Sequence, residues 1–349
     1  MPGPVTTRPR SKPTAGFIFI FLLLCALCAF FPARLRSEAL RSQSSPAKSQ
    51  SSAASGDAQQ PSKENGTYVI RKDVDEVVLH ATVVDDKQHI ITDLTRNDFT
   101  VLEDGKPQNI ISFHHEDFPV SMGIVIDNSG SMREKRAKVN QAALNLVRAS
   151  NPQDEVFIVN FNDEYYLDQD FTNDLLKLKE ALEKIDARGG TALRDALVAS
   201  AEHLKKYARL DRKVLFVVTD GEDNASRESL EDTVKQLQEE NGPAVYAIGI
   251  LGDEEHPKRA KRALEIIAER TGGMAFFPKT LDEVDEISRH VAHDIRSQYI
   301  IGYKPTNPKT SGGFRAIRVE AKAKRHGKLI VRTKSGYYPR TGPAVVGAN

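Results

Sequence analysis

The chain has 349 residues, enough for about two domains of ordinary size. Its 49 lysines and arginines nearly balance 48 aspartates and glutamates, so no strong positive field exists that would hold nucleic acid. Both cysteines lie in the apolar run at 17–31, which leaves the rest of the chain without a disulfide framework, a thiolate zinc site or a cysteine nucleophile.

Residues 1–36 have the pattern of an export signal. Basic residues precede the unbroken apolar run, and this order is typical of a secretory leader. The run falls short of the roughly 20 residues that span a bilayer, so a cleaved signal peptide and an uncleaved anchor at 16–32 both stay open. In either case we expect the chain beyond residue 40 to be exported, to the periplasm or the extracellular space, and to meet a membrane only through this segment.

Residues 37–65 are rich in serine, glutamine, alanine and proline and contain few large apolar side chains. Such a composition buries too little apolar surface to offset the entropy lost on ordering. We therefore expect a disordered linker, with the folded part beginning near residue 66.

Residues 66–118 favour β-strands. The apolar-rich runs at 77–84 and 110–113 indicate strands, and an Asp-Gly pair at 104–105 predicts a tight turn. So few strands are not stable alone, and the region needs further strands from elsewhere in the chain.

Between residues 119 and 297, short apolar runs alternate with amphipathic helical stretches. The expected strands lie at 122–126, 156–161, 214–218, 245–250 and 275–277. Each is apolar on both faces, which is typical of parallel strands covered by helices on both sides, whereas the more polar run at 165–171 fits an antiparallel edge strand. A capping pattern at 280–283 marks the start of the last helix. The alternation predicts a Rossmann-like, doubly wound α/β domain with a mainly parallel sheet.

Two aspartates directly follow buried strands of this domain, at the end of the sheet where ligands of open α/β folds bind. Asp127 opens a turn that contains Ser129 and Ser131, and Asp220 follows a later strand. Thr191 begins the helix between them. All five side chains offer hard oxygen donors, which suit Mg²⁺, Mn²⁺ or Ca²⁺, whereas zinc and copper favour nitrogen or sulfur. We expect a divalent-cation site, with Mg²⁺ as the first choice.

Helix capping would explain any one of the hydroxyls, but it does not explain Asp127, because the charge of a carboxylate at the end of a buried strand needs compensation. Further acidic residues follow Asp220, namely Glu222, Asp223 and Glu228. They favour a solvated acidic rim over a second cation site.

The set Asp127-x-Ser129-x-Ser131, Thr191 and Asp220, placed on alternating strands and helices, resembles the metal-ion-dependent adhesion site of the von Willebrand factor type A (VWA) domain. By that resemblance, Ser129, Ser131 and Thr191 would approach the metal with their hydroxyls. Asp127 and Asp220 would act directly or through water. The resemblance also implies a protein partner whose Glu or Asp side chain completes the coordination of the metal.

Residues 298–340 again favour β-strands and carry eleven basic residues against one acidic residue, whereas residues 66–118 carry five basic and eleven acidic residues. Because opposite charges stabilise paired strands, we expect the two flanks to form one β-sandwich around the α/β domain, followed by a tail at 341–349. The motifs at 94–105 and 298–303 resemble a family of exported bacterial VWA-related proteins with this arrangement. A basic surface on 298–340 for an anionic polymer or lipid headgroups is the alternative.

The sequence therefore favours a non-enzymatic, cation-dependent binding protein of the bacterial envelope. A metal-assisted hydrolase is the second hypothesis, with Asp127 as nucleophile. Phosphatases of that kind usually carry a second acidic residue two positions later, where this chain has Ser129. The third hypothesis is a structural envelope subunit that does not use metal for binding.

Overall fold

The computed structural model describes residues 76–183, 187–252, 256–307 and 312–340, together with the short strands β1 (Lys63–Glu64) and β2 (Thr67–Tyr68). The predicted leader, the predicted tail and nearly all of the predicted linker lie outside the described residues. In the part of the chain that is described, no helix is both long and apolar enough to cross a membrane.

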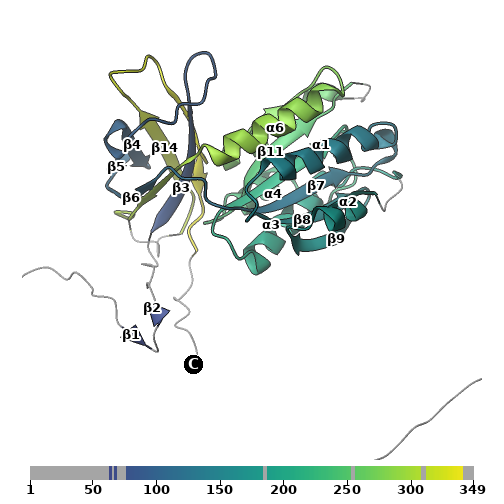
Figure 1. The fold of residues 1–349 in the computed structure, drawn as a ribbon, viewed down its shortest axis with the longest axis horizontal. Helices are drawn as coiled ribbons and strands as arrows, with labels where there is room; N and C mark the ends of the chain where they lie inside the picture. The colour runs from purple at the N-terminus through teal and green to yellow at the C-terminus, as the bar shows by residue number, and fades with distance from the viewer. Residues whose placement is uncertain are drawn as a thin grey trace, which may run out of the picture. The chain divides into compact units, whose positions relative to one another are not determined.

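A six-stranded sheet forms the centre of the α/β domain, in the order β12-β11-β10-β7-β8-β9 (Figure 1). Its strands are β7 (Ser121–Asp127), β8 (Glu155–Phe161), β9 (Tyr165–Thr172), β10 (Lys213–Thr219), β11 (Ala244–Gly249) and β12 (Ala275–Phe276). All pairs are parallel except that of β8 with the edge strand β9. The predicted mainly parallel sheet and its antiparallel edge are confirmed, and the carboxyl ends of β7 and β10 lie side by side.

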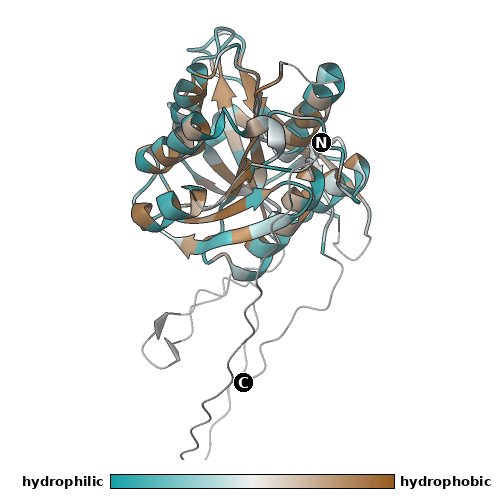
Figure 2. Ribbon diagram, turned by 90° about the vertical axis from the view of Figure 1, so that its right-hand side faces the viewer, coloured by the Kyte–Doolittle hydropathy of each residue, from teal (hydrophilic) through white to brown (hydrophobic). Residues whose placement is uncertain are grey.

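Helices cover both faces of this sheet. Within the described ranges they are α1 (Arg136–Ala149), α2 (Leu175–Glu183), α3 (Leu193–Tyr207), α4 (Leu230–Leu237), α5 (Pro257–Thr271) and α6 (Glu283–Arg296). Successive strand residues point to opposite faces, so Ile124 packs in the core with α1, α2 and α6, and Val125 packs with α3, α4 and α5. Figure 2 shows largely apolar strands between helices that carry both hydrophilic and hydrophobic residues.

The start of α6 differs from the prediction. Asp282, and not Thr280, precedes the first turn of the helix, and it makes no capping hydrogen bond with its side chain. The backbone turns tightly at this point, because Thr280 O accepts a hydrogen bond from Glu283 N (3.3 Å). As a result the Glu283 carboxylate reaches Lys279 N (2.9 Å) instead of the backbone of Thr280, and the expected capping box does not form.

Two four-stranded antiparallel sheets form a β-sandwich from both flanks of the α/β domain. The strands from the first flank are β3 (Val77–Val84), β4 (Phe99–Glu103), which follows the short 3-10 turn Arg96–Asp98, β5 (Lys106–Gln108) and β6 (Ile110–His114). Those from the second are β13 (Tyr299–Tyr303), β14 (Arg315–Ala321), β15 (Ile330–Arg332) and β16 (Gly336–Tyr337).

The strand orders, β15-β3-β13-β6 and β16-β14-β4-β5, mix the two flanks in each sheet. The predicted sandwich of N- and C-terminal strands is therefore confirmed. Asp104 and Gly105 join β4 to β5 with positive φ angles of 48° and 77°, as a tight hairpin turn requires.

A buried carboxylate connects the last helix of the α/β domain to the sandwich. Asp294 on α6 accepts hydrogen bonds from the Tyr246 hydroxyl on β11 and from Arg332 on β15, each at 2.6 Å. Gln298 also donates to the Tyr246 hydroxyl (3.0 Å). Burial raises the pKa of Tyr246 well above its usual value, so this hydroxyl stays a donor at any ordinary pH.

Within the sandwich, Glu103 of the first flank is bound by three side chains of the second. Its carboxylate accepts hydrogen bonds from Tyr303 (2.6 Å), Tyr337 (3.0 Å) and Arg315 (3.1 Å). Both members of the Glu103–Arg315 ion pair are buried. Breaking such a pair leaves an uncompensated charge in the interior.

We expect Glu103→Leu to reduce the free energy of unfolding by about 3 to 5 kcal/mol, since it removes the carboxylate that pairs with the buried Arg315 and accepts from Tyr303 and Tyr337. Glu103→Gln, which keeps an oxygen acceptor, should cost less. Urea denaturation measures both, with Glu320→Gln on β14 as control, because the ion pairs of Glu320 involve the exposed side chains of Arg318 and Lys322. Equal losses for Glu103→Leu and Glu320→Gln would contradict the role of Glu103.

Candidate metal centre

The last residue of β7, Asp127, is fully buried, and both of its carboxylate oxygens accept hydrogen bonds. Oδ1 accepts from Ser129 N (2.8 Å) and Oδ2 accepts from the Thr219 hydroxyl at the end of β10 (2.6 Å). Burial raises the pKa of Asp127 to about 6, and the nearby charge of Asp220 acts in the same direction, against the hydrogen bonds. The carboxylate therefore sits where a cation would offset a real desolvation cost.

The hydroxyls of the turn after β7 connect to Asp220. Ser129 Oγ lies 3.1 Å from Ser131 Oγ, and Ser131 Oγ donates to Asp220 Oδ1 (2.9 Å). Ser129 and Asp220 are buried, whereas Ser131 is exposed. Four of the five predicted ligands thus form one cluster that runs from the end of the sheet to the surface.

Thr191, the fifth predicted ligand, lies in the loop before α3. Its hydroxyl is close to Gly221, since a Cβ built on that glycine would lie 3.4 Å from Thr191 Oγ1, and Gly221 follows Asp220. The loop is tied to the turn after β7 by the hydrogen bond from Gly130 N to Gly189 O (3.2 Å). Thr191 is therefore placed beside the cluster.

Polar side chains hold the loop that carries Thr191 in place. Asp163 Oδ1 accepts a hydrogen bond from Gly190 N (2.8 Å), and Asn224 Oδ1 accepts one from Thr191 N (2.9 Å). A Cβ on Gly190 would lie 2.7 Å from Asn224 Oδ1 and 2.8 Å from Asp163 Oδ1. A larger residue at position 190 would therefore displace these two acceptors from their present positions.

The chemistry of the cluster fits a small, hard dication. Its carboxylate and hydroxyl oxygens are hard donors of the kind that Mg²⁺ and Ca²⁺ prefer, and hydrogen bonds of 3.1 and 2.9 Å hold the oxygens of Ser129, Ser131 and Asp220 together. Among the described residues, no group of three or more His, Cys, Asp or Glu side chains could hold a metal ion.

Three further residues support the cluster and were not predicted from the sequence. Thr219 donates to Asp127, and Lys135 forms an ion pair with Asp220. The buried Arg136 donates to Asn160 Oδ1 (3.1 Å) and to the backbone oxygen of Asp127 (3.4 Å). One signal was available, because two consecutive basic residues stand where α1 begins, and the start of a helix favours acidic ones.

Two of the three acidic residues that follow Asp220 are paired with basic groups, whereas Glu228 accepts a hydrogen bond from the neutral Gln236 side chain (3.4 Å). Asp223 accepts hydrogen bonds from the Arg194 side chain (3.0 and 3.1 Å). Glu222 contacts His256 (3.3 Å) and Arg259 (3.0 Å). These contacts favour an acidic rim that is neutralised within the protein over a second cation site.

Comparison with known proteins agrees with the fold. Residues 122–222 match the family model of the von Willebrand factor type A domain, and this part of the chain has a VWA-like fold. No curated protein matches the chain.

Three solved structures illustrate the likeness, which is one of fold. A point mutant of the PilB minor pilin from Streptococcus sanguinis is 13% identical, with a TM-score of 0.43, over 51% of this chain and 62% of that one. A von Willebrand factor type A protein from Catenulispora acidiphila is 15% identical, with a TM-score of 0.45, over 70% of this chain and 74% of that one. Proximal thread matrix protein 1 from the mussel byssus, with a zinc-occupied metal-ion-dependent adhesion site (MIDAS) motif, is 19% identical, with a TM-score of 0.45, over 56% of this chain and 50% of that one. The chain thus spans less than two thirds of the pilin and of the mussel protein.

We expect Thr219→Val to reduce the free energy of unfolding by about 1 to 3 kcal/mol at pH 7, because it removes a donor from a buried carboxylate. Since burial raises the pKa of Asp127 to about 6, the penalty should shrink below that pH, where the carboxyl becomes neutral. Urea denaturation in the presence of chelator measures both effects.

Thr233→Val is the matched control for this substitution. Thr233 is equally buried, but its hydroxyl donates to the neutral backbone oxygen of Ser229 (2.8 Å). A Thr219→Val penalty no larger than that of Thr233→Val, or one independent of pH, would contradict the role of Thr219.

Proposed function

We propose that Asp127, Ser129, Ser131, Thr191 and Asp220 hold one divalent cation, Mg²⁺ in the first place and Mn²⁺ or Ca²⁺ as alternatives. The protein would use this cation to bind a Glu or Asp side chain of a protein partner. The observation that carries the proposal is the hydrogen-bonded cluster of Ser129, Ser131 and Asp220 oxygens, which lies next to the buried Asp127.

The charge of the donor set explains why a partner carboxylate would bind the cation favourably. Two carboxylates and three neutral hydroxyls only just balance a dication, and hydroxyls donate little electron density to it. A cation held in this way stays electrophilic and gains from one more anionic oxygen. Ser131 is the exposed member of the cluster, so such an oxygen would approach from its side.

The surroundings of Asp127 support binding over hydrolysis. A nucleophilic aspartate needs a free carboxylate oxygen that faces the substrate. Here both oxygens accept hydrogen bonds from the protein, and the side chain is fully buried. We therefore propose a binding protein and keep the metal-assisted hydrolase as the alternative that an activity assay decides.

The domain organisation that we propose keeps residues 119–297 as the VWA domain, inserted between the halves of a sandwich formed by 66–118 and 298–340. The leader pattern at 1–36 supports export, with the binding face outside the cytoplasmic membrane. This part of the proposal rests on the sequence.

We expect calorimetric titration to detect binding of Mg²⁺ and Mn²⁺ to the purified protein, and Asp127→Asn to weaken it by roughly 100-fold, because a buried ligand charge is lost. Asp223→Asn is the matched control, since Asp223 lies near the site but is paired with Arg194. Absence of metal binding by the wild type would favour the structural subunit. Equal effects of the two substitutions would show that the metal does not bind at Asp127.

We expect the immobilised protein to retain a partner from envelope extract in Mg²⁺ and to release it on addition of chelator, because the partner carboxylate binds through the metal. The same partner, purified, should not bind to Asp127→Asn. Retention that survives both chelation and the substitution would contradict the metal mechanism. Turnover of generic phosphate esters in Mg²⁺ that Asp127→Asn abolishes would establish the hydrolase instead.

A further inference from the structure

The residue that directly precedes α1 breaks the local rules for a helix start. Lys135 occupies the position before the first turn and makes no capping hydrogen bond with its side chain. A lysine has no acceptor with which to cap backbone N–H groups. Its positive charge also lies at the positive end of the helix dipole, and the first turn of α1 contains no acidic residue. Some other contact must stabilise a lysine at this point.

That contact is with the candidate metal centre. Lys135 Nζ forms an ion pair with Asp220 Oδ2, while Asp220 Oδ1 accepts the hydrogen bond from Ser131. The Asp220 side chain is fully buried, and that of Lys135 is 25% exposed. One carboxylate is therefore shared between the ammonium and the hydroxyl cluster.

We propose that Lys135 and the divalent cation compete for Asp220, so that the ammonium sets the metal affinity of the site. The inference rests on the proposed function and deepens it. An ammonium and a dication on one buried carboxylate repel each other strongly, since little water screens them. Binding of the cation to Asp220 therefore weakens or breaks the ion pair of Lys135.

The ammonium of Lys135 can separate from Asp220, whereas the guanidinium of its neighbour Arg136 is held in place. The guanidinium of Arg136 is buried and donates to the Leu182 backbone oxygen (2.8 Å) and to Asn160 (3.1 Å). Lys135 instead carries its charge on a flexible four-carbon chain, and its side chain already reaches solvent. Its ammonium can thus move into water when a cation takes its carboxylate, which keeps the exchange reversible.

The first test compares Lys135→Met with Lys138→Met by calorimetric titration with Mg²⁺. Lys138 lies in the first turn of the same helix and pairs with Asp282, with both side chains more than half exposed. The two variants therefore lose the same charge from the same helix start. We expect Lys135→Met to bind Mg²⁺ roughly tenfold more tightly than the wild type, and Lys138→Met to stay within about twofold of it.

The second test uses the wild-type protein and does not depend on the folding of a variant. A limiting amount of an amine-acylating reagent is applied with and without saturating Mg²⁺, and peptide mass spectrometry measures the modification of each lysine. We expect Mg²⁺ to raise the modification of Lys135 several-fold, because its ammonium is released to solvent, and to leave that of Lys138 unchanged.

Each outcome decides one of the two proposals. If the wild type binds Mg²⁺, but Lys135→Met matches it in affinity or the acylation of Lys135 does not change, the competition is wrong and the proposed metal site stands. If neither the wild type nor Lys135→Met binds Mg²⁺ or Mn²⁺, the proposed metal site is wrong, and the competition is wrong with it.

Discussion

The burial of two carboxylates at the ends of neighbouring parallel strands is the constraint on which the functional end of this protein depends. Asp127 ends β7 and Asp220 follows β10, and β7 and β10 pair directly in the sheet. Two like charges in the interior are costly unless donors or cations surround them. The Thr219 hydroxyl, the turn with Ser129 and Ser131, and the ammonium of Lys135 all supply part of that compensation.

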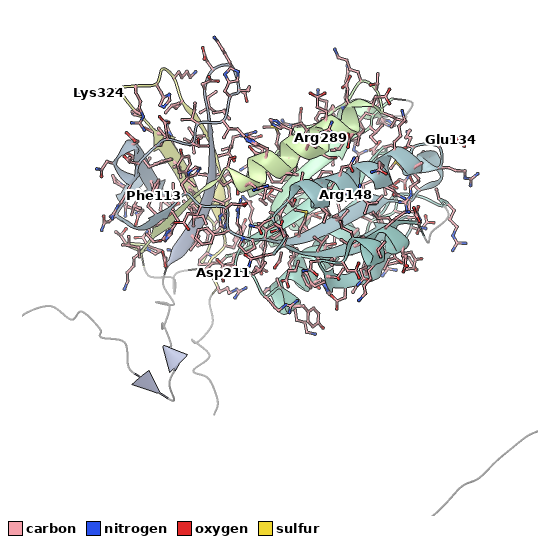
Figure 3. The ribbon with its side chains drawn as sticks, viewed as in Figure 1. Phe113, Glu134, Arg148, Asp211, Arg289 and Lys324 are labelled. Atoms are coloured by element: carbon pink, nitrogen blue, oxygen red, sulfur yellow. The ribbon has the colours of Figure 1, made fainter. Side chains whose placement is uncertain are left out.

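This compensation is incomplete, and that is the physical basis of the proposed metal site. The donors on Asp127 are a hydroxyl and a backbone N–H, and its pKa is still raised to about 6. A dication would relieve the remaining cost at both carboxylates together. In Figure 3, the label of Glu134 marks the loop that carries Lys135, between the end of β7 and the start of α1. Ser131, the exposed member of the cluster, and Lys135, whose ammonium pairs with Asp220, thus belong to the same short segment.

In the sandwich, the net charges of the two flanks predict that they pair, but they contribute little to the stability of the pairing. The opposite net charges of the two flanks predicted that they pair, and the strand orders confirm it. Yet one cross-flank ion pair, Glu103 with Arg315, is buried, whereas the pair of Arg325 with Asp93 is about half exposed. Exposed pairs add little to stability, so the apolar alternation of the strands contributes more to the pairing than the summed charge does. Lys324, labelled in Figure 3 in the loop between β14 and β15, is one of the basic residues that remain on the surface.

The sequence by itself determined the alternation of strands and helices and the mainly parallel sheet, because apolar periodicity is a local pattern. It also predicted the five oxygen-bearing side chains of the candidate site, because aspartates at strand ends are a local pattern too. Only the tertiary structure decided that Thr219 would bind Asp127 and that Lys135 would bind Asp220, since these partners lie 92 and 85 residues apart. It also decided the start of α6, where a backbone turn overrode a capping pattern. Local preference sets which element forms, whereas the balance of buried charge depends on which elements meet, and that is a property of the folded chain.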